Sequence, residues 1–113
     1  MHIYTSNFSK NCKNENAISI ARKTPAWANC RRYIKLAPSY SLLMDYKKGR
    51  VNKEQYKEIY KKETLDKLDP IEIMNELGDG AILLCYEKSS DFCHRHIVAQ
   101  WLMANTNIIV EEI

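Results

Sequence analysis

AILLCY, at residues 81–86, is the longest uncharged apolar run in this chain of 113 residues, and it follows the turn GDG at 78–80. An unbroken apolar run of this length is typical of a strand that helices cover on both faces. The loop 87–90 should lead into a helix from about Phe92 to Ala104, and IIVEEI at 108–113 should form a last strand. This order predicts a βαβ unit with parallel strands.

Two further strands and four further helices are expected before AILLCY. HIYTSNF at 2–8 alternates loosely between apolar and polar residues, and AISIA at 17–21 is a compact apolar run. Thr24-Pro25 and Asp69-Pro70 resemble helix starts, in which one residue caps the helix and proline takes the first position. The expected helices cover about 25–36, 39–49, 52–62 and 69–77. We therefore predict a small three-layer α/β domain over residues 1–113, with about four mostly parallel strands and helices on both faces.

Composition is that of an ordinary globular protein. Hydrophobic residues make up 45% and charged residues 27% of the chain, and three glycines and three prolines are too few for a disordered one. AILLCY is far shorter than the roughly 20 apolar residues of a membrane helix, and the first residues lack the pattern of a secretory signal. We expect a cytoplasmic protein without membrane contact, in which the four cysteines are free thiols.

The charge is distributed unevenly along the chain. Residues 1–62 hold 14 Lys or Arg and 4 Asp or Glu, a balance of +10, whereas residues 63–113 hold 3 and 10, a balance of −7. Charges spread over a solvated surface would explain this, and so would a basic face for phosphates. A non-catalytic module that binds nucleic acid or protein through the basic half is thus an alternative to a catalytic or ligand-binding site. The sequence does not indicate an oligomeric state.

Chemically active side chains follow two of the expected strands. AISIA is followed by Arg22, AILLCY includes Cys85 and Tyr86 with Glu87 after it, and the last helix begins near Cys93-His94-Arg95. Ligands of parallel sheets bind beyond the carboxyl ends of the strands. If both strands run the same way, one site should contain Arg22, Cys85, Glu87, Cys93, His94 and Arg95.

The first kind of site that fits is an anion site. Arg22 and Arg95, with Tyr86 and the N–H groups of the helix start, could hold the phosphate of a nucleotide or of a nucleic-acid end. An Arg95 that is buried and fully paired with carboxylates would count against this interpretation.

The second kind is thiol chemistry, with Cys85 or Cys93 as nucleophile and Glu87 or His94 as base. A thiol at a helix N-terminus has a lowered pKa, which favours such a role for Cys93. Phosphatase and rhodanese loops place an arginine closer to a catalytic cysteine than the ten residues that separate Cys85 from Arg95.

The third kind is a metal site made of Cys85, Cys93 and His94 or His96. Adjacent residues such as Cys93 and His94 should point apart on one helix, so we predict no metal and no cofactor. Plainer roles also fit: Cys85 could be a small buried apolar residue, and Arg95 could pair with a nearby carboxylate.

The larger aromatic residues have helical spacing among apolar neighbours, which assigns them to the core, with base stacking as the lesser alternative. These residues are Trp27, Tyr56, Tyr60 and Trp101.

LLCYEK at 83–88, followed by FCHR at 92–95, closely resembles the signature of the domain of unknown function 488 family. Further matches are IYT at 3–5, ISIAR at 18–22, Pro25, Tyr33, LAPS at 36–39 and LDP at 68–70. The resemblance spans nearly the whole chain. It implies a small cytoplasmic α/β protein in which the six residues above form one site, and it implies no substrate. Many members carry an aspartate where this chain has Ala21, so no role of that carboxylate is expected here.

Overall fold

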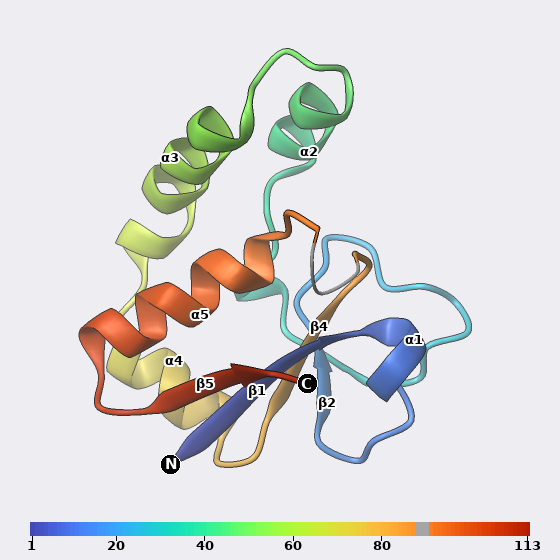
Figure 1. Cartoon of the computed structure of the whole chain (residues 1–113), viewed down its shortest axis with the longest axis vertical. Helices are drawn as coiled ribbons and strands as arrows, with labels where there is room; N and C mark the ends of the chain where they lie inside the picture. Colours follow the sequence, from blue (N-terminus) through green and yellow to red (C-terminus); the bar gives the residue numbers. More distant parts are fainter. Residues whose placement is uncertain (88–90) are drawn as a thin grey trace.

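The computed structural model describes residues 1–87 and 91–113, and its centre is a parallel sheet of five strands (Figure 1). The strands are β1 (His2–Asn7), β2 (Ala17–Ser19), β3 (Arg31–Arg32), β4 (Ile82–Cys85) and β5 (Ile109–Glu112). Their order across the sheet is β3-β2-β4-β1-β5. The predicted α/β class is confirmed, with five strands where about four were expected.

The two strands that carry the predicted site lie side by side. Ile18 of β2 is paired with Leu83 of β4 in a parallel register, and Ser19 is paired with Leu84. β2 and β4 therefore end at the same edge of the sheet, which we call the carboxyl edge. The expected parallel arrangement of AISIA and AILLCY is confirmed.

One face of the sheet is covered by long helices. Ile3, Ile18, Leu83 and Val110 from four strands share a core with side chains of α4 (Pro70–Leu77) and α5 (His94–Asn105). In the view of Figure 1, α5 lies above β5 and β1. Asp69 caps α4 by accepting a hydrogen bond from the backbone N–H of Ile71, as the Asp69-Pro70 pattern predicts.

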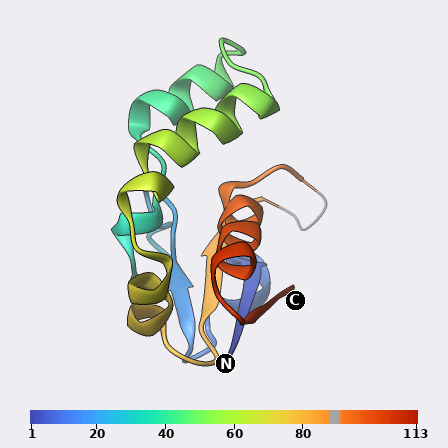
Figure 2. The ribbon, with the colours of Figure 1, turned by 90° about the vertical axis from the view of Figure 1, so that its left-hand side faces the viewer.

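Two helices form a hairpin that projects from the sheet. α2 (Tyr40–Lys47) and α3 (Lys53–Glu63) lie side by side in Figures 1 and 2. Tyr46 and Tyr56 pack against Phe92, with ring centroids 5.3 and 5.2 Å from that of Phe92. The hairpin therefore contacts the segment that leads into α5. No helix of residues 1–87 and 91–113 is both long enough and apolar enough to cross a membrane.

The other face of the sheet has a thinner cover. Phe8 of α1 (Phe8–Asn11), a single turn of helix, packs with Ala21 and Ala28 against Ile82 and Leu84. Helices were expected on this face. In the structure, one turn of helix and the irregular segment 20–30 cover it instead.

The expected helix over 25–36 is wrong. Arg31 and Arg32 form β3 beside β2, and Ile34–Leu36 is a short 3-10 helix, as is Leu65–Lys67 later in the chain. The hydroxyl of Thr24 lies 2.7 Å from that of Ser19 in β2 and so is engaged with the preceding strand instead of capping a helix. Trp27, expected in the core, is 63% exposed.

Candidate functional site at the carboxyl edge

Cys85 and Cys93 meet at the carboxyl edge, where the structure joins them by a disulfide. Cys85 is the last residue of β4, and Cys93 is the residue that precedes α5. Both are buried, with exposed fractions of 1% and 4%. Cys12 and Cys30 are free thiols. The expectation of free thiols is therefore wrong for the pair at the edge and right for the other two.

Cys93 and His94 converge although they are neighbours in the chain. Cys93 has an extended backbone, with φ −153° and ψ 147°, and the helix begins at His94. The Sγ atom of Cys93 lies 3.8 Å from Nδ1 of His94 as a result. The expected divergence is wrong because it placed both residues on the helix.

His94 is buried and held in one orientation. Its Nε2 lies 2.7 Å from the backbone oxygen of Ile20, which can only accept a hydrogen bond, so we assign the proton to Nε2. The lone pair of Nδ1 then faces Cys93. Burial, together with the smaller effect of the positive charge of Arg95, lowers the pKa of His94 to about 4, so the ring is neutral at neutral pH. The ring of Tyr60 packs edge-on against it, with 5.6 Å between centroids.

Arg95 is fully buried, and its three nitrogens have partners. Nε and Nη2 donate to the two carboxylate oxygens of Glu112, at 3.1 and 2.9 Å. Nη1 donates to Sγ of Cys85 and to the backbone oxygen of Glu87, both at 2.9 Å. A guanidinium engaged in this way does not fit the expectation that Arg95 itself binds an anion.

Glu112 is the carboxylate that balances the buried guanidinium. Burial raises its pKa, but hydrogen bonds from Arg95 and from the hydroxyl of Thr5 outweigh this effect, and the net shift is downward. Glu112 is therefore ionised at neutral pH. The ion pair between Arg95 and Glu112 thus holds the guanidinium in contact with the sulfur of Cys85.

The remaining predicted residues form an exposed rim beside the buried cluster. The hydroxyl of Tyr86 donates to the backbone oxygen of Lys23 at 2.6 Å, and Nε of Arg22 donates to the backbone oxygen of Pro38 at 2.8 Å. The side chains of Arg22, Tyr86 and Glu87 are exposed. Lys88 of the LLCYEK motif and the two serines of the predicted loop lie outside the described residues.

Sequence reasoning missed Glu112, Thr5 and Tyr60. Thr5 and Glu112 are register partners in β1 and β5, close to the carboxyl ends of these strands. The carboxyl ends of parallel strands meet at one edge of the sheet, and this rule applies to the last strand as well as to those that carry Arg22 and Cys85. The acidic residues at the end of IIVEEI could therefore have been predicted to lie near the site.

The arrangement suits three kinds of chemistry. The two thiols can close the disulfide, a reduced Cys85 can act as a thiolate beside Arg95, and sulfur and imidazole ligands can hold a metal ion. The two Sγ atoms and a ring nitrogen of His94 lie within 4.8 Å of one another. Zinc prefers such ligands, and a bound histidine commonly donates its other N–H to a carbonyl, as His94 does here.

Residues 3–106 match the family model described as the active DUF488-N3 subclade. The match covers the sheet except β5 and the first residue of β1, and it includes the cysteine, histidine and arginine cluster. Nothing among the curated proteins or the solved structures matches the chain.

Proposed function

We propose that this chain, which belongs to the DUF488 family, uses Cys85 as a thiolate nucleophile on a phosphate-bearing ligand, such as a nucleotide or a nucleic-acid end. The observation that carries the proposal is the 2.9 Å contact from Nη1 of Arg95 to Sγ of Cys85. A guanidinium at this distance stabilises a thiolate relative to a thiol. The description of the matched subclade as active agrees with a chemical role.

The contact between Cys85 and Arg95 is of the kind that thiol-dependent phosphate chemistry requires. The ten intervening positions do not keep the two groups apart, because the chain returns to the carboxyl edge at the start of α5. Fixed by Glu112, the guanidinium keeps its place whether or not a ligand is bound. Arg95 thereby stabilises the nucleophile, whereas direct contact with the ligand falls to other residues.

Arg22 is the residue that we assign to the anion. It is exposed, and among the contacts described for residues 1–87 and 91–113 its guanidinium uses Nε alone. Its two Nη groups can therefore donate to phosphate oxygens. The segment that carries Arg22 is held against the cluster, because His94 donates to the backbone oxygen of Ile20.

The proposed reaction has two steps. The electron pair of the Cys85 thiolate attacks phosphorus, the bond to the ester oxygen breaks, and the leaving oxygen takes a proton from solvent water. A water molecule, deprotonated by Glu87, then displaces sulfur from phosphorus and restores the thiolate. Glu87 is suited to accept this proton because its exposed carboxylate belongs to the rim, two residues beyond Cys85, and it then releases the proton to solvent.

The reaction needs the reduced form of the protein. Within the disulfide, Cys85 is not a thiolate and cannot act as a nucleophile. A dithiol reductant must first supply two electrons and two protons, which converts the disulfide into two thiols. We therefore assign the disulfide to an inactive, oxidised form.

Protection by phosphate tests the proposal. Reduced protein is treated with hydrogen peroxide, with and without inorganic phosphate, and the disulfide between Cys85 and Cys93 is followed by mass spectrometry of the peptides. Phosphate should slow oxidation several-fold, because it occupies the approach to Cys85. Arg22→Gln should abolish the protection, while Arg50→Gln, which removes an exposed arginine outside the rim, should retain it. Protection that is absent, or that survives Arg22→Gln unchanged, would contradict the proposal.

A second candidate is a non-catalytic nucleic-acid-binding module. Its support is the exposure of Lys47, Lys48 and Arg50 at the end of α2, on the projecting hairpin. Retention on single-stranded nucleic acid should then fall steeply with salt. Exchange of the three residues for alanine should weaken the retention, and Cys85→Ser should leave it unchanged.

A further inference from the structure

We infer that the ligand of this site is a nucleotide whose base lies in a cavity beside Trp27, on the thinly covered face of the sheet. The inference rests on the proposed function for the position of the phosphate, and it adds the part of the ligand that the protein recognises. Its evidence comes from residues outside the cysteine cluster.

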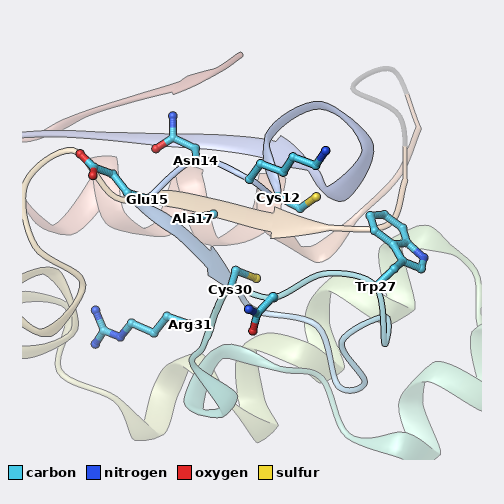
Figure 3. A pocket seen from close by; sticks show the side chains of 9 residues that line it. Cys12, Asn14, Glu15, Ala17, Trp27, Cys30 and Arg31 are labelled. Carbon is cyan, nitrogen blue, oxygen red and sulfur yellow. The ribbon is translucent and has the colours of Figure 1, made fainter.

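The cavity has a volume of about 410 Å³, within the roughly 300–1,000 Å³ that is common for small-molecule sites. Figure 3 shows the indole of Trp27 at one end and the side chains of Glu15 and Arg31 toward the other, with Cys12 and Cys30 between them. Ala17 and the two cysteines form the small, apolar part of a lining that is otherwise largely polar. We place the flat ring of the base between this part and the indole.

Trp27 is the residue that indicates an aromatic ligand. Its side chain is 63% exposed, although tryptophan is among the residues that proteins bury most extensively. The segment 20–30 is also connected to β2 by the hydrogen bond between Thr24 and Ser19 and to β3 by the chain itself, so the indole is presented from an anchored loop. An exposed indole on such a loop is a stacking surface for a base.

A row of aromatic rings leads from the cavity to the nucleophile. The ring of Phe8 packs edge-on against Trp27 on one side and against Tyr86 on the other, with centroid distances of 6.4 and 5.1 Å. Phe8 is 2% exposed, while Tyr86 is 53% exposed and directly follows Cys85. Phe8 thus connects the indole that would hold the base to Tyr86 at the rim, and we place the ribose and the phosphate along this row.

Polar side chains at the cavity can recognise the edge of a base. Asn14 and Asn29 line it, and an amide offers both a donor and an acceptor to a heterocycle. The Oδ1 atom of Asn14 already accepts the backbone N–H of Asn16, which holds this side chain in place and leaves its NH2 group as the donor. Lys13 adds positive charge at the same wall.

The test compares ligands that share a phosphate and differ in the base. Reduced protein carrying Trp101→Phe, in which Trp27 is the remaining tryptophan, is titrated with adenosine monophosphate, ribose phosphate and adenosine. Adenosine monophosphate should quench the fluorescence of Trp27 and bind at least about tenfold more tightly than ribose phosphate, because base stacking adds to phosphate binding. Adenosine should also bind more weakly than adenosine monophosphate.

Substitution of the indole separates a stacking role from a structural one. The affinities of the variants are compared through the protection of Cys85 from oxidation by peroxide. Trp27→Ala should lower the preference for adenosine monophosphate over ribose phosphate about tenfold, and Trp27→Phe should retain part of this preference. Tyr40→Ala, which removes another exposed aromatic side chain on α2, is the matched control and should retain all of it. Equal affinity for adenosine monophosphate and ribose phosphate, or for adenosine monophosphate and adenosine, would overturn the inference. A failure of the proposed function differs from both outcomes, because it appears as the absence of phosphate protection at Cys85.

Discussion

At the scale of single residues, the site depends on how a buried guanidinium is satisfied. A charge taken out of water is strongly destabilising unless it is paired and hydrogen-bonded. Arg95 meets this condition through both oxygens of Glu112, a backbone carbonyl and the sulfur of Cys85. Three of these acceptors are oxygens that help to fix its position, and the fourth is the proposed nucleophile. The contact with sulfur is therefore part of the fold and does not wait for a ligand.

His94 should make the stability of the protein depend on pH. Its folded-state pKa of about 4 lies below the ordinary value of 6.5, so between these values the unfolded chain binds a proton that the folded protein excludes. Stability should accordingly fall as the pH drops from about 6.5 toward 4, by up to about 3 kcal/mol at the lower end. Urea unfolding across this range measures the effect. His94→Gln retains a donor for Ile20 and should show a smaller fall; an identical pH dependence of both proteins would contradict the assignment.

At the scale of elements, the hairpin of α2 and α3 stabilises the site by packing against the start of α5. The buried hydroxyl of Tyr60 on α3 donates to the backbone oxygen of Leu36, while its ring packs on His94. One side chain thus connects the hairpin, the 3-10 helix at Ile34–Leu36 and the histidine of the cluster.

Tyr60→Phe should destabilise the protein by about 1–3 kcal/mol, because it leaves the buried oxygen of Leu36 without a donor. The free energy of unfolding in urea measures this cost. Tyr40→Phe, at an exposed tyrosine of α2, provides the control and should change stability by less than about 0.5 kcal/mol. A cost equally small for Tyr60→Phe would mean that the hydroxyl does not connect these elements.

Elements with strong local signals could be predicted from the sequence. The ILLC part of AILLCY forms β4, and the Asp69-Pro70 start of α4 has the expected cap. The local sequence alone could not exclude the helix expected after Thr24-Pro25, because these two residues are typical of a helix start. What decides against it is tertiary: Thr24 contacts Ser19, and Arg31-Arg32 pair with β2.

The candidate site shows the same division. Strand direction was enough to bring Arg22, Cys85 and the start of α5 to one edge. It could not show that Arg95 is turned inward onto Glu112, because that pairing depends on the register of β5 beside β1. Nor could it show the extended backbone of Cys93, on which the approach to His94 depends.

At the scale of the whole molecule, the disulfide connects the centre of the sheet to the helix that covers it. It joins residues 8 positions apart, at the end of β4 and the start of α5. Closing a loop of this size restricts the unfolded chain. The oxidised protein should therefore be the more stable and the reduced protein the reactive form.

Reduction should lower the free energy of unfolding by about 2–3 kcal/mol, as expected for a cross-link over 8 positions. Urea unfolding with and without a phosphine reductant gives this difference. Cys93→Ser cannot form the bond, so its stability should not respond to the reductant. An equal response of this variant would assign the effect to other thiols, such as Cys12 and Cys30.

The ionisation state of Cys85 in the reduced protein is the most direct measurement of the central claim. Thiolates absorb more ultraviolet light than thiols, and this difference can be recorded at neutral pH even for a sulfur that is buried. The reduced protein should show one thiolate that Cys85→Ser removes and that Cys93→Ser leaves in place. A spectrum without thiolate, or a thiolate lost with Cys93→Ser and retained in Cys85→Ser, would show that Arg95 does not sustain a nucleophile at the end of β4.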